Sequence, residues 1–510
     1  MIEVVCKDGT ARARGDLRAE FGHRVPSTTD TIDDGVYAGW SFKGGRLHLF
    51  NDRYGMHPCF YAIENRNDAS VLRVSDCVLR LLAEGVDPEP DHEARSAFLR
   101  FGFYLGHDTP FKHIKALPPR AAASVEHGRW SVAGSYTPAP PRDWTEEQAI
   151  EAFIEGLRGA IRRRPCDPER AAMPLTAGRD SRHIILELAR QGMAPKETLT
   201  SNPYPALRDT ESEVAGAVAR HVGVNHETIE REESLIDLDE ERNLRTDLLT
   251  DEGTWAEILR PRLKELSPAF AYDGIAGNGL AESKKSGARH ARLFAQGRYE
   301  ELADTLIRQH EPPGLGIDPF VPCGRERAYD RSRVVERTAG LLKECEGEAN
   351  PVERWYARSR TRREVVLCTT RVFGFVPTYY APFIDHELYD NLASVPAEDL
   401  ARFGDIHSKA IARAYPDAAD LPYGTPGSGA RFSGRALEMA DALLRLGLYA
   451  ARHRPARTPR VAIWTAQRIA DRRAEKTMPR RFLQYMIQLE HIDKATQDPG
   501  QIRSMLERVQ

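Results

Sequence analysis

The first quarter of the chain alternates between apolar and polar positions over short stretches, and each stretch ends in a turn signal. Residues 35–50 form two such stretches on either side of Lys43-Gly44-Gly45, and residues 120–134 form two more around His127-Gly128. A period of two places alternate side chains on one face of a strand, and small flexible residues between two such runs favour a hairpin. The pattern predicts antiparallel strands up to residue 134.

The pattern changes after a proline-rich segment at residues 135–144. Thr145 and Gln148 then have the spacing of a helix capping box, and apolar residues follow at helical intervals. Further strand-like runs cover residues 171–175, 197–201 and 226–232, with helical patterns that begin near residues 145, 183 and 210. Strands that alternate with helices predict a parallel α/β sheet. We therefore expect two domains, 1–138 and 144–510, the second mainly helical beyond residue 240.

Composition narrows the class of protein only coarsely. The chain has 510 residues, of which 41% are hydrophobic and 29% charged, and its formal net charge is −3. This balance is typical of a globular protein and gives no reason to expect a nucleic-acid or membrane partner. No apolar run approaches the roughly 18 residues of a membrane span, and the seven cysteines are scattered without a CxxC pair. We expect a cytoplasmic protein with reduced thiols.

An arginine-rich tail extends from residue 445 to residue 481. Two interpretations are open. The arginines are either the solvated faces of helices or a docking patch for an acidic partner, formed by Arg454, Arg457 and Arg460.

The clearest chemical signal lies between a predicted strand and a predicted helix. The residues there are Leu175, Thr176, Ala177, Gly178, Arg179, Asp180, Ser181 and Arg182. Small residues let backbone N–H groups face one concavity, and the first helical turn adds unpaired N–H groups and the positive end of a dipole. Such a site binds anions, and Arg179 or Arg182 would add a guanidinium for phosphate. An aspartate in an anion site requires a cation, and Mg²⁺ held by carboxylates and phosphate oxygens meets that need.

The segment LTAGRDSR resembles the SGGxDS loop of the ATP pyrophosphatases, specifically of the asparagine synthetase family. Three more stretches resemble segments of that family in the same order along the chain. These are NDRYGMHP with Phe60-Tyr61 (residues 51–61), similar to RDRFGxxPLYY of its glutaminase-type domain; YDGIAGNG (residues 272–279), similar to its glycine-rich loop; and APFIDH (residues 381–386), similar to VPFLDH. The resemblance implies an amino-terminal αββα sandwich of the Ntn-hydrolase type, followed by a parallel-sheet ATP pyrophosphatase domain with a helical extension.

The resemblance also implies site residues and cofactors, ATP and Mg²⁺. ATP or pyrophosphate contacts are expected from residues 175–182 and from Thr200, Ser201, Gly274, Gly277 and Lys284. Asp180 would hold Mg²⁺ with Asp273 or Asn278 assisting, although Asn278 stands where the family has an aspartate. Asp180 would serve catalysis directly, and so would Arg179, which stands where the family usually has an apolar or small residue. Tyr379 and Tyr380 would either position an attacking amine or pack as core aromatics. His183, which follows the loop, is expected on a helix face rather than in catalysis.

The chain departs from the family at positions that determine which molecule donates the nitrogen. Glutaminase domains of the family begin with a catalytic cysteine, whereas this sequence begins Met1-Ile2-Glu3 and its first cysteine is Cys6. A thiol without that position lacks its activation, so we expect a degenerate domain that does not hydrolyse glutamine. A glutamate expected before APFIDH is replaced by Pro377-Thr378, and a lysine expected near residue 431 is absent, leaving Arg431, Lys284 or Lys285 to supply its charge.

These departures resemble the β-lactam synthetases and the lasso-peptide macrocyclases, in which an amine of the substrate attacks the adenylated carboxylate. We expect an ATP- and Mg²⁺-dependent amide-forming ligase of specialised metabolism that joins a carboxylate substrate to such an amine. Two alternatives stay open: a macrocyclase that acts on a peptide precursor, and a pseudo-synthetase that binds nucleotide or a partner without chemistry.

Overall fold

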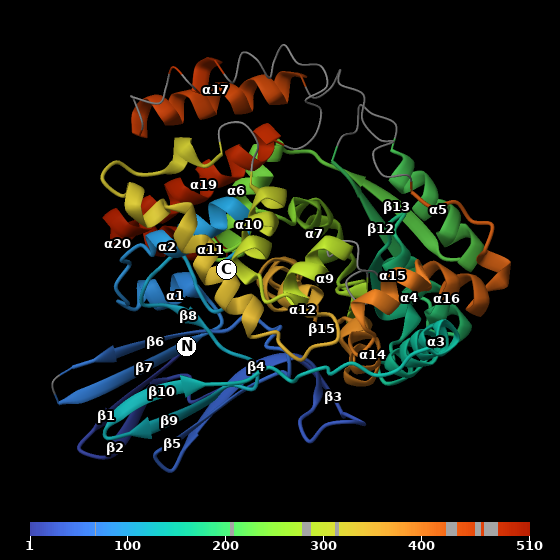
Figure 1. Cartoon of the computed structure of the whole chain (residues 1–510), viewed down its shortest axis with the longest axis horizontal. Coiled ribbons are helices and arrows are strands. Elements are labelled where there is room, and N and C mark those ends of the chain that lie inside the picture. Colours follow the sequence, from blue (N-terminus) through green and yellow to red (C-terminus); the bar gives the residue numbers. More distant parts are fainter. Residues whose placement is uncertain are drawn as a thin grey trace.

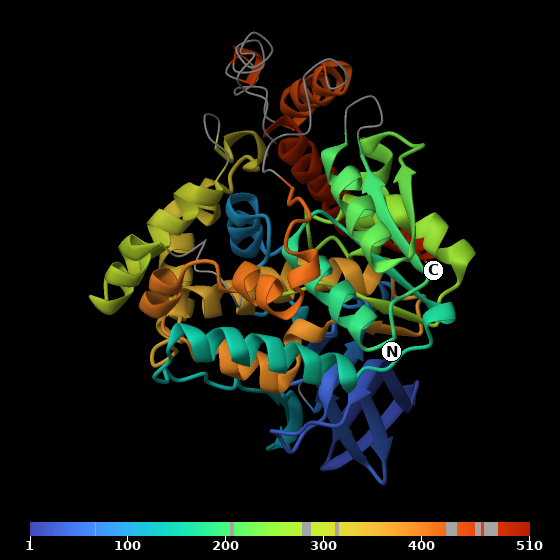
Figure 2. The ribbon, with the colours of Figure 1, turned by 90° about the vertical axis from the view of Figure 1, so that its right-hand side faces the viewer.

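Two kinds of β-sheet organise the protein (Figures 1 and 2). The computed structural model describes residues 1–66, 68–203, 209–277, 287–311, 316–424, 436–453, 459, 461–463 and 478–509. Antiparallel sheets occupy the amino-terminal part of the chain, and a parallel sheet lies within the remainder, which is mainly helical. The mixed α/β class predicted from the sequence is confirmed at this level.

The amino-terminal residues form a sandwich of antiparallel sheets. One sheet has the order β2(Thr10–Gly15), β1(Ile2–Lys7), β7(Ala69–Ser75), β6(Phe60–Asn65), β8(Lys115–Ala116); the other has β3(Arg18–Val25), β4(Asp34–Lys43), β5(Arg46–Asn51); and β9(Ala122–Glu126) pairs with β10(Arg129–Ala133). Both predicted hairpins are confirmed. Gly44 and Gly45 have φ values of +57° and +75°, as required by the tight turn whose twist matches paired strands.

Strand β6 shows how the five-stranded sheet is covered on both faces. Tyr61 and Ile63 pack against the core of the sandwich, whereas Phe60 and Ala62 face a second core. Helices from both ends of the chain form this second core: α1(Val78–Ala83), α2(His92–Phe101), α19(Met478–Gln497) and α20(Pro499–Val509). The amino-terminal sandwich therefore shares its core with the last helices of the chain.

The sandwich has one helical layer where the resemblance implied two. Within the described part of residues 1–138, α1 and α2 are the helices, and both lie on the side of the five-stranded sheet. The opposite sheet exposes Arg18, Glu20 and Arg24 of β3 on its outer face. A strand that alternates polar and apolar residues needs cover on one face only, so this face is stable in water without a helical layer.

The sheet in the remainder of the chain, after the amino-terminal sandwich, is parallel throughout, as predicted. Its order is β13(Asn225–Glu230), β12(Glu197–Asn202), β11(Ala171–Pro174), β14(Phe270–Tyr272), β15(Thr378–Tyr380). One face packs against α3(Glu146–Arg162), α4(Arg179–Arg190) and α5(Thr210–Val222), and the other against α7(Thr254–Leu266) and α13(Val366–Val372). Met173 of β11 faces the first group and Ala172 the second. The predicted capping box of Thr145 and Gln148 begins α3.

Helices dominate the described chain beyond residue 240, as predicted. The remaining elements are α6(Leu235–Arg245), α9(Ala288–Ala295), α10(Tyr299–His310), α11(Arg331–Lys343), α12(Pro351–Tyr356), the π-helix η4(Ala357–Val365), α14(His386–Ala393), α15(Ala397–Phe403), α16(Ile406–Ala414) and α17(Ala436–His453), with short 3₁₀ turns at Pro168–Arg170, Asp318–Phe320, Glu326–Tyr329, Pro382–Ile384 and Pro416–Ala418. Among the described residues, no helix is both long enough and apolar enough to cross a membrane.

Candidate functional site

The strand order of the parallel sheet creates a crevice between β11 and β14. The chain proceeds outward from β11 to β12 and β13, and later places β14 on the other side of β11. At such a switch point the loops that leave the two strands diverge, and ligands of open α/β sheets bind between them. Here the loops are residues 175–178, which lead into α4, and residues 273–277, which follow β14. The structure brings together two segments that the sequence identified separately. We call them the loop site.

Two hydroxyl groups hold the first loop in shape. Ser181 Oγ accepts a hydrogen bond from the Thr176 N–H at 3.1 Å and lies 3.1 Å from Thr176 Oγ1. Thr176 Oγ1 in turn accepts the N–H of Gly178 at 3.1 Å. Gly178, the residue before α4, has no side chain to cap the helix, so the N–H groups of the first turn and the positive end of the dipole face the loop. The backbone thus forms an anion site, and the hydroxyls of Thr176 and Ser181 shape it.

Asp180 lies directly beneath the second loop, and glycines make this approach feasible. A Cβ atom on Gly274 would lie 2.6 Å from Cβ of Asp180, and one on Gly277 would lie 2.7 Å from its Oδ1. Both separations are far shorter than a van der Waals contact, so only glycine fits at either position without a shift. The predicted site residues Gly274 and Gly277 therefore lie against the predicted metal ligand.

Asp273 provides a second carboxylate at the same edge of the sheet. The Tyr379 hydroxyl donates a hydrogen bond to Asp273 Oδ2 at 2.7 Å, and the Asp273 N–H donates to the Tyr380 carbonyl at 2.8 Å. Burial raises the pKa of Asp273 to about 6, while the Tyr379 hydroxyl and nearby backbone N–H groups act in the opposite direction. Tyr379 is therefore part of the site through Asp273.

The two tyrosines, predicted together, have different environments. The ring of Tyr380 lies 5.2 Å from that of Tyr272 and 4.9 Å from that of His23, centroid to centroid, and its side chain is buried. Successive residues of a strand point to opposite faces, which separates Tyr380 from Tyr379. Of the two interpretations open for these residues, Tyr380 fits the core aromatic.

The two arginines of the loop are paired with protein groups in this structure, and their predicted contact with phosphate stays a prediction. Arg179 forms an ion pair with Asp405, the residue that caps α16. Arg182 donates to the carbonyl of Leu421 at 3.1 Å, and its guanidinium lies 3.8 Å from the ring centroid of Tyr423. Burial lowers the pKa of Arg182. Both side chains tie α4 to the segment around residues 405–424.

The other predicted contacts are only partly placed. Thr200 is buried at the end of β12, and its hydroxyl donates to the carbonyl of Leu175, so it fixes the start of the loop; Ser201 follows it and is half-buried. The remaining predicted positions lie outside the described residues: Asn278, Lys284, Lys285, Arg431, Arg454, Arg457 and Arg460. Of the basic tail, Arg445 and Arg452 are described and exposed, whereas Arg481, also described, pairs with Asp251 at 3.3 Å inside the protein.

A cavity of about 230 Å³ adjoins the loop site. Asp180, Asp273 and Gly274 line one side of it, and α12, η4 and α14 line the other. Glu353 of α12 and Arg360 of η4 also line the cavity, and no motif in the sequence marks either of them. Helices of the π type are rare and occur frequently at functional sites. The rarity of η4 is a structural signal that periodicity in the sequence does not reveal.

The carboxylates of the loop site fit a hydrated divalent cation better than a preformed metal centre. Among the described residues, the group of three side chains able to hold a metal is Asp87, Glu89 and His113 at the surface, where Lys112 already donates to Glu89 at 3.0 Å. Asp180 and Asp273 do not belong to such a group. Mg²⁺ retains waters and is commonly held by one or two carboxylates together with phosphate oxygens, which matches this donor set.

Comparison with known proteins leaves this geometry to be interpreted by itself. The chain matches no protein-family model and no curated protein. The resemblance of its four segments to the asparagine synthetase family therefore remains an inference from the motifs, and the function has to be argued from the site.

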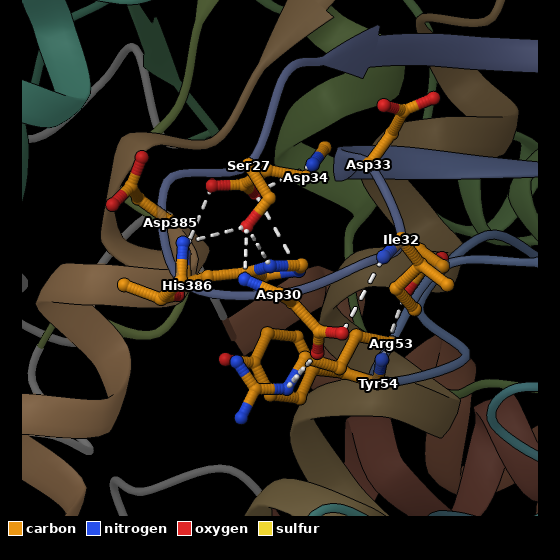
Figure 3. Close-up of polar contacts among 12 residues, drawn as sticks. Ser27, Asp30, Ile32, Asp33, Asp34, Arg53, Tyr54, Asp385 and His386 are labelled. Atoms are coloured by element: carbon orange, nitrogen blue, oxygen red, sulfur yellow. Dashed lines mark hydrogen bonds and ion pairs between the residues drawn. The ribbon is translucent and has the colours of Figure 1, made fainter.

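The other two motifs meet at a second polar region, shown in Figure 3. We call it the joint: Asp34 of β4, Arg164 after α3, and Asp385 and His386 at the start of α14. Arg164 donates to Asp34 Oδ1 at 3.0 Å and to Asp385 Oδ2 at 2.7 Å, and all three side chains are at most 3% exposed. The His386 N–H donates to Asp34 Oδ2 at 2.9 Å. The APFIDH segment therefore attaches the amino-terminal sandwich to the rest of the protein.

The NDRYGMHP segment supports the same contact. Asp52 accepts the N–H groups of Tyr54, Met56 and His57 at 2.9–3.0 Å, which fixes the turn. Arg53 then pairs with Asp390 of α14 at 2.8 Å, while Figure 3 shows it facing Asp30. Both motifs thus serve the joint, and Phe383 of APFIDH also lies against Gly277 of the loop site.

The two carboxylates of the joint have opposite electrostatic environments. Burial raises the pKa of Asp34 to about 6, and the nearby charge of Asp385 adds to this, although Arg164 acts in the opposite direction. Burial disfavours the ionised form of Asp385 as well, but Arg164 and Arg163 together hold its pKa at about 2. Asp385 has two guanidinium partners, whereas Asp34 has only the one that it shares with Asp385, which explains the difference between their pKa values.

Proposed function

We propose that the protein is an ATP- and Mg²⁺-dependent carbon–nitrogen ligase of specialised metabolism. It activates a carboxylate as an acyl-adenylate, releases pyrophosphate, and lets an amine other than glutamine-derived ammonia attack. The observation that carries the proposal is the meeting of the loop of residues 175–178 with the loop of residues 273–277 at the switch point of a parallel sheet, with Asp180 and Asp273 beside one cavity. An uncapped helix terminus and two carboxylates suit a polyphosphate with its cation.

In this proposal the backbone of the first loop and the first turn of α4 bind the pyrophosphate portion of ATP. Asp180 and Asp273 hold Mg²⁺, which when bound neutralises charge on the departing pyrophosphate. The hydroxyls of Ser181 and Thr176 keep the loop in its binding shape before the substrate arrives, so little reorganisation is needed during the reaction. The shape of the loop is in this sense the main contribution of the chain to the first step.

The cavity would hold the acyl substrate and its amine. An oxygen of the carboxylate attacks the α-phosphorus of ATP and pyrophosphate departs; the amine then attacks the acyl carbon, AMP departs, and the amine loses a proton. Glu353, on the wall opposite the loop site, is the group to which we assign that proton. A volume of about 230 Å³ favours a small acyl substrate over a peptide precursor. Holding both groups in one cavity makes the second step effectively intramolecular.

The amino-terminal sandwich is a support in this proposal and not a glutaminase. Cys6 lies within β1 and is buried in the core between the sheets, away from the loop site. A thiol enclosed by apolar side chains has no access to a substrate amide and no adjacent base to activate it. The nitrogen therefore has to come from an amine that the substrate itself carries.

Binding of Mg²⁺ and a non-hydrolysable ATP analogue, measured by calorimetry, tests the proposal before the substrate is known. We expect Asp180→Ala to weaken Mg²⁺-dependent binding by at least about 10-fold. The matched control is Asp237→Ala, because Asp237 also lies in the first turn of a helix beside a serine, in α6. Equal binding by wild type and Asp180→Ala would show that the loop does not hold the cation.

A pseudo-synthetase is the second candidate, and the pairing of Arg179 and Arg182 with protein groups favours it. Exchange of labelled pyrophosphate into ATP, measured with a panel of amino acids and other carboxylic acids, separates the two. Exchange that one acid stimulates supports the ligase. The pseudo-synthetase is supported if the protein binds nucleotide but exchanges no pyrophosphate with any acid in the panel. That panel has to include acids that are shown to bind because they stabilise the protein.

A further inference from the structure

A pair of buried imidazoles lies behind Asp180. His407 of α16 has its Nδ1 3.5 Å from Asp180 Oδ1, and its Nε2 is 3.1 Å from Nδ1 of His183 on α4. Both histidines are fully buried. The sequence offered no sign of His407, and His183 was expected only on a helix face. His407 thus lies between His183, at hydrogen-bond distance, and the carboxylate of Asp180, at ion-pair distance.

The directions of these contacts follow from proton counting. A neutral imidazole has one N–H and one acceptor nitrogen. Burial lowers the pKa of His183 to about 3, so this ring is neutral at neutral pH. If His407 Nε2 donated to His183, its Nδ1 would turn a lone pair toward the carboxylate of Asp180. The favourable arrangement has His183 Nδ1–H donating to His407 Nε2, and His407 Nδ1–H directed at Asp180 Oδ1.

The start of α16 contacts the loop site a second time. Asp405, which caps α16 two residues before His407, forms the ion pair with Arg179. Adjacent residues of the loop, Arg179 and Asp180, are therefore both contacted by the first residues of one helix. α16 packs against α3 and α4, as seen at the right of Figure 1, so these contacts come from a fixed element.

We propose that His407 is a positioning residue for Asp180. By directing its Nδ1–H at Oδ1, it fixes the rotation of the carboxylate that holds the cation. This inference rests on the proposed function, because it assumes that Asp180 holds Mg²⁺. Partners that orient a metal ligand in this way commonly change metal affinity by about 10- to 100-fold when removed.

Two amide substitutions at one position test the proposal. In His407→Asn the side-chain amide can occupy the position of Nδ1 and donate to Asp180, whereas in His407→Gln it reaches the position of Nε2 and faces His183. Both variants are polar and smaller than, or close to, the imidazole in volume, so their effects on folding are comparable. The probe is Mn²⁺ in place of Mg²⁺, titrated with the non-hydrolysable ATP analogue and followed by electron paramagnetic resonance.

We expect His407→Gln to weaken Mn²⁺ binding by about 10-fold or more and His407→Asn to keep it close to wild type. His491→Asn is the matched control, because His491 is a buried histidine of α19 that bonds to Asn243 at 2.8 Å; it should lower the melting temperature and leave Mn²⁺ affinity unchanged. Equal Mn²⁺ affinity in the two His407 variants, with Asp180→Ala defective, would overturn the positioning role alone. Wild-type protein that binds neither Mn²⁺ nor the analogue would overturn the proposed function as well.

Discussion

The loop site and the joint are both polar, but they are constructed in opposite ways. The first loop of the loop site consists mainly of backbone N–H groups, small residues and hydroxyls that are close neighbours in the sequence. The joint consists of fully buried charges from distant parts of the chain: Arg164 and Asp34 are 130 residues apart, and His386 and Asp34 are 352 apart. A site that must exchange ligands keeps its carboxylates near a cavity, whereas a fixed contact neutralises its carboxylates internally.

This difference separates the four motifs by their structural role. The two segments that lead into the loop site lie beside a cavity, and the two that build the joint lie in the protein interior. All four attracted attention in the sequence for the same reason, a resemblance to one family. Substitutions at the joint should therefore act mainly on stability, and those at the loop site mainly on ligand binding.

The largest effect should come from removing the guanidinium of the joint. Arg164→Met leaves Asp34 and Asp385 buried with less compensation, and breaking a buried ion pair by removal of one partner costs about 3–5 kcal/mol. We expect the free energy of unfolding, measured by urea denaturation, to fall by about this amount, with Mg²⁺-dependent nucleotide binding kept below the melting temperature. The control is Arg66→Met, which removes an exposed pair with Glu64 and should change little. A loss of nucleotide binding in folded Arg164→Met protein would contradict the separation of the two regions.

The next effect concerns the pH dependence of the joint. The fold raises the pKa of Asp34 from 3.8 to about 6, so the folded protein binds this proton more tightly than the unfolded chain does. This contribution stabilises the fold at low pH and is lost as the pH rises from about 4 through about 6. The total loss of folding free energy is up to about 3 kcal/mol, because each pKa unit corresponds to about 1.4 kcal/mol. Asp34→Asn should remove this slope, so its stability relative to wild type should rise over that interval.

Among the groups that face Asp34, the guanidinium groups do not titrate between about pH 4.5 and pH 7, and the pKa of Asp385 is held at about 2. Burial lowers the pKa of His386 from 6.5 to about 4, so His386 makes the fold more stable as the pH rises through this range, opposite to Asp34. Wild type and Asp34→Asn both carry His386, so the difference between their stability profiles isolates Asp34. Asp385 contributes with the opposite sign, since its stabilisation is lost as the pH falls from about 4 toward 2. Parallel stability profiles for wild type and Asp34→Asn, recorded by urea denaturation, would show that Asp34 does not titrate in this range.

Substitutions at the loop site should change stability less than those at the joint and should change nucleotide binding more. Gly277→Ala places a methyl group 2.7 Å from Asp180 Oδ1 and 2.9 Å from the ring of Phe383. We expect a cost of about 1–3 kcal/mol and a clear loss of Mg²⁺-dependent nucleotide binding, because the carboxylate must move. Gly340→Ala is the control, since a Cβ atom there has nothing within 4 Å and α11 should gain about 0.5–1 kcal/mol. Gly277→Ala with normal nucleotide affinity would remove Asp180 from the binding site.

The sequence predicted those features that depend on neighbouring residues. Alternation and turn residues predicted the hairpins at Gly44-Gly45 and His127-Gly128, and the switch between strand and helix periods predicted the parallel sheet. The loop of residues 175–182 was predicted for the same reason, because its shape follows from its own small residues and from the helix that it begins.

Contacts between distant side chains could not be predicted in the same way. The choice of a partner for Arg179 is decided by where α16 packs, 226 residues further along the chain, and nothing near Arg179 in the sequence indicates it. His407 was missed because a histidine in an amphipathic helix has no local signature. The π-helix η4 was missed because its sequence, ARSRTRREV, has too few apolar residues to reveal a period.

The smallest effect tests whether Arg179 belongs to the loop site or only to its support. Its ion pair with Asp405 predicts that Arg179→Leu and Asp405→Asn behave alike: each should cost about 0–1 kcal/mol and weaken binding of the ATP analogue only slightly, because each releases the same contact between α4 and α16. A guanidinium that serves phosphate gives a different pattern, in which Arg179→Leu weakens binding and Asp405→Asn strengthens it by freeing the charge. Calorimetry on the two variants, with Asp180→Ala as the reference for a full loss, distinguishes these patterns. Equal small effects would identify Arg179 as a structural charge between α4 and α16, and opposite effects would return it to the phosphate site.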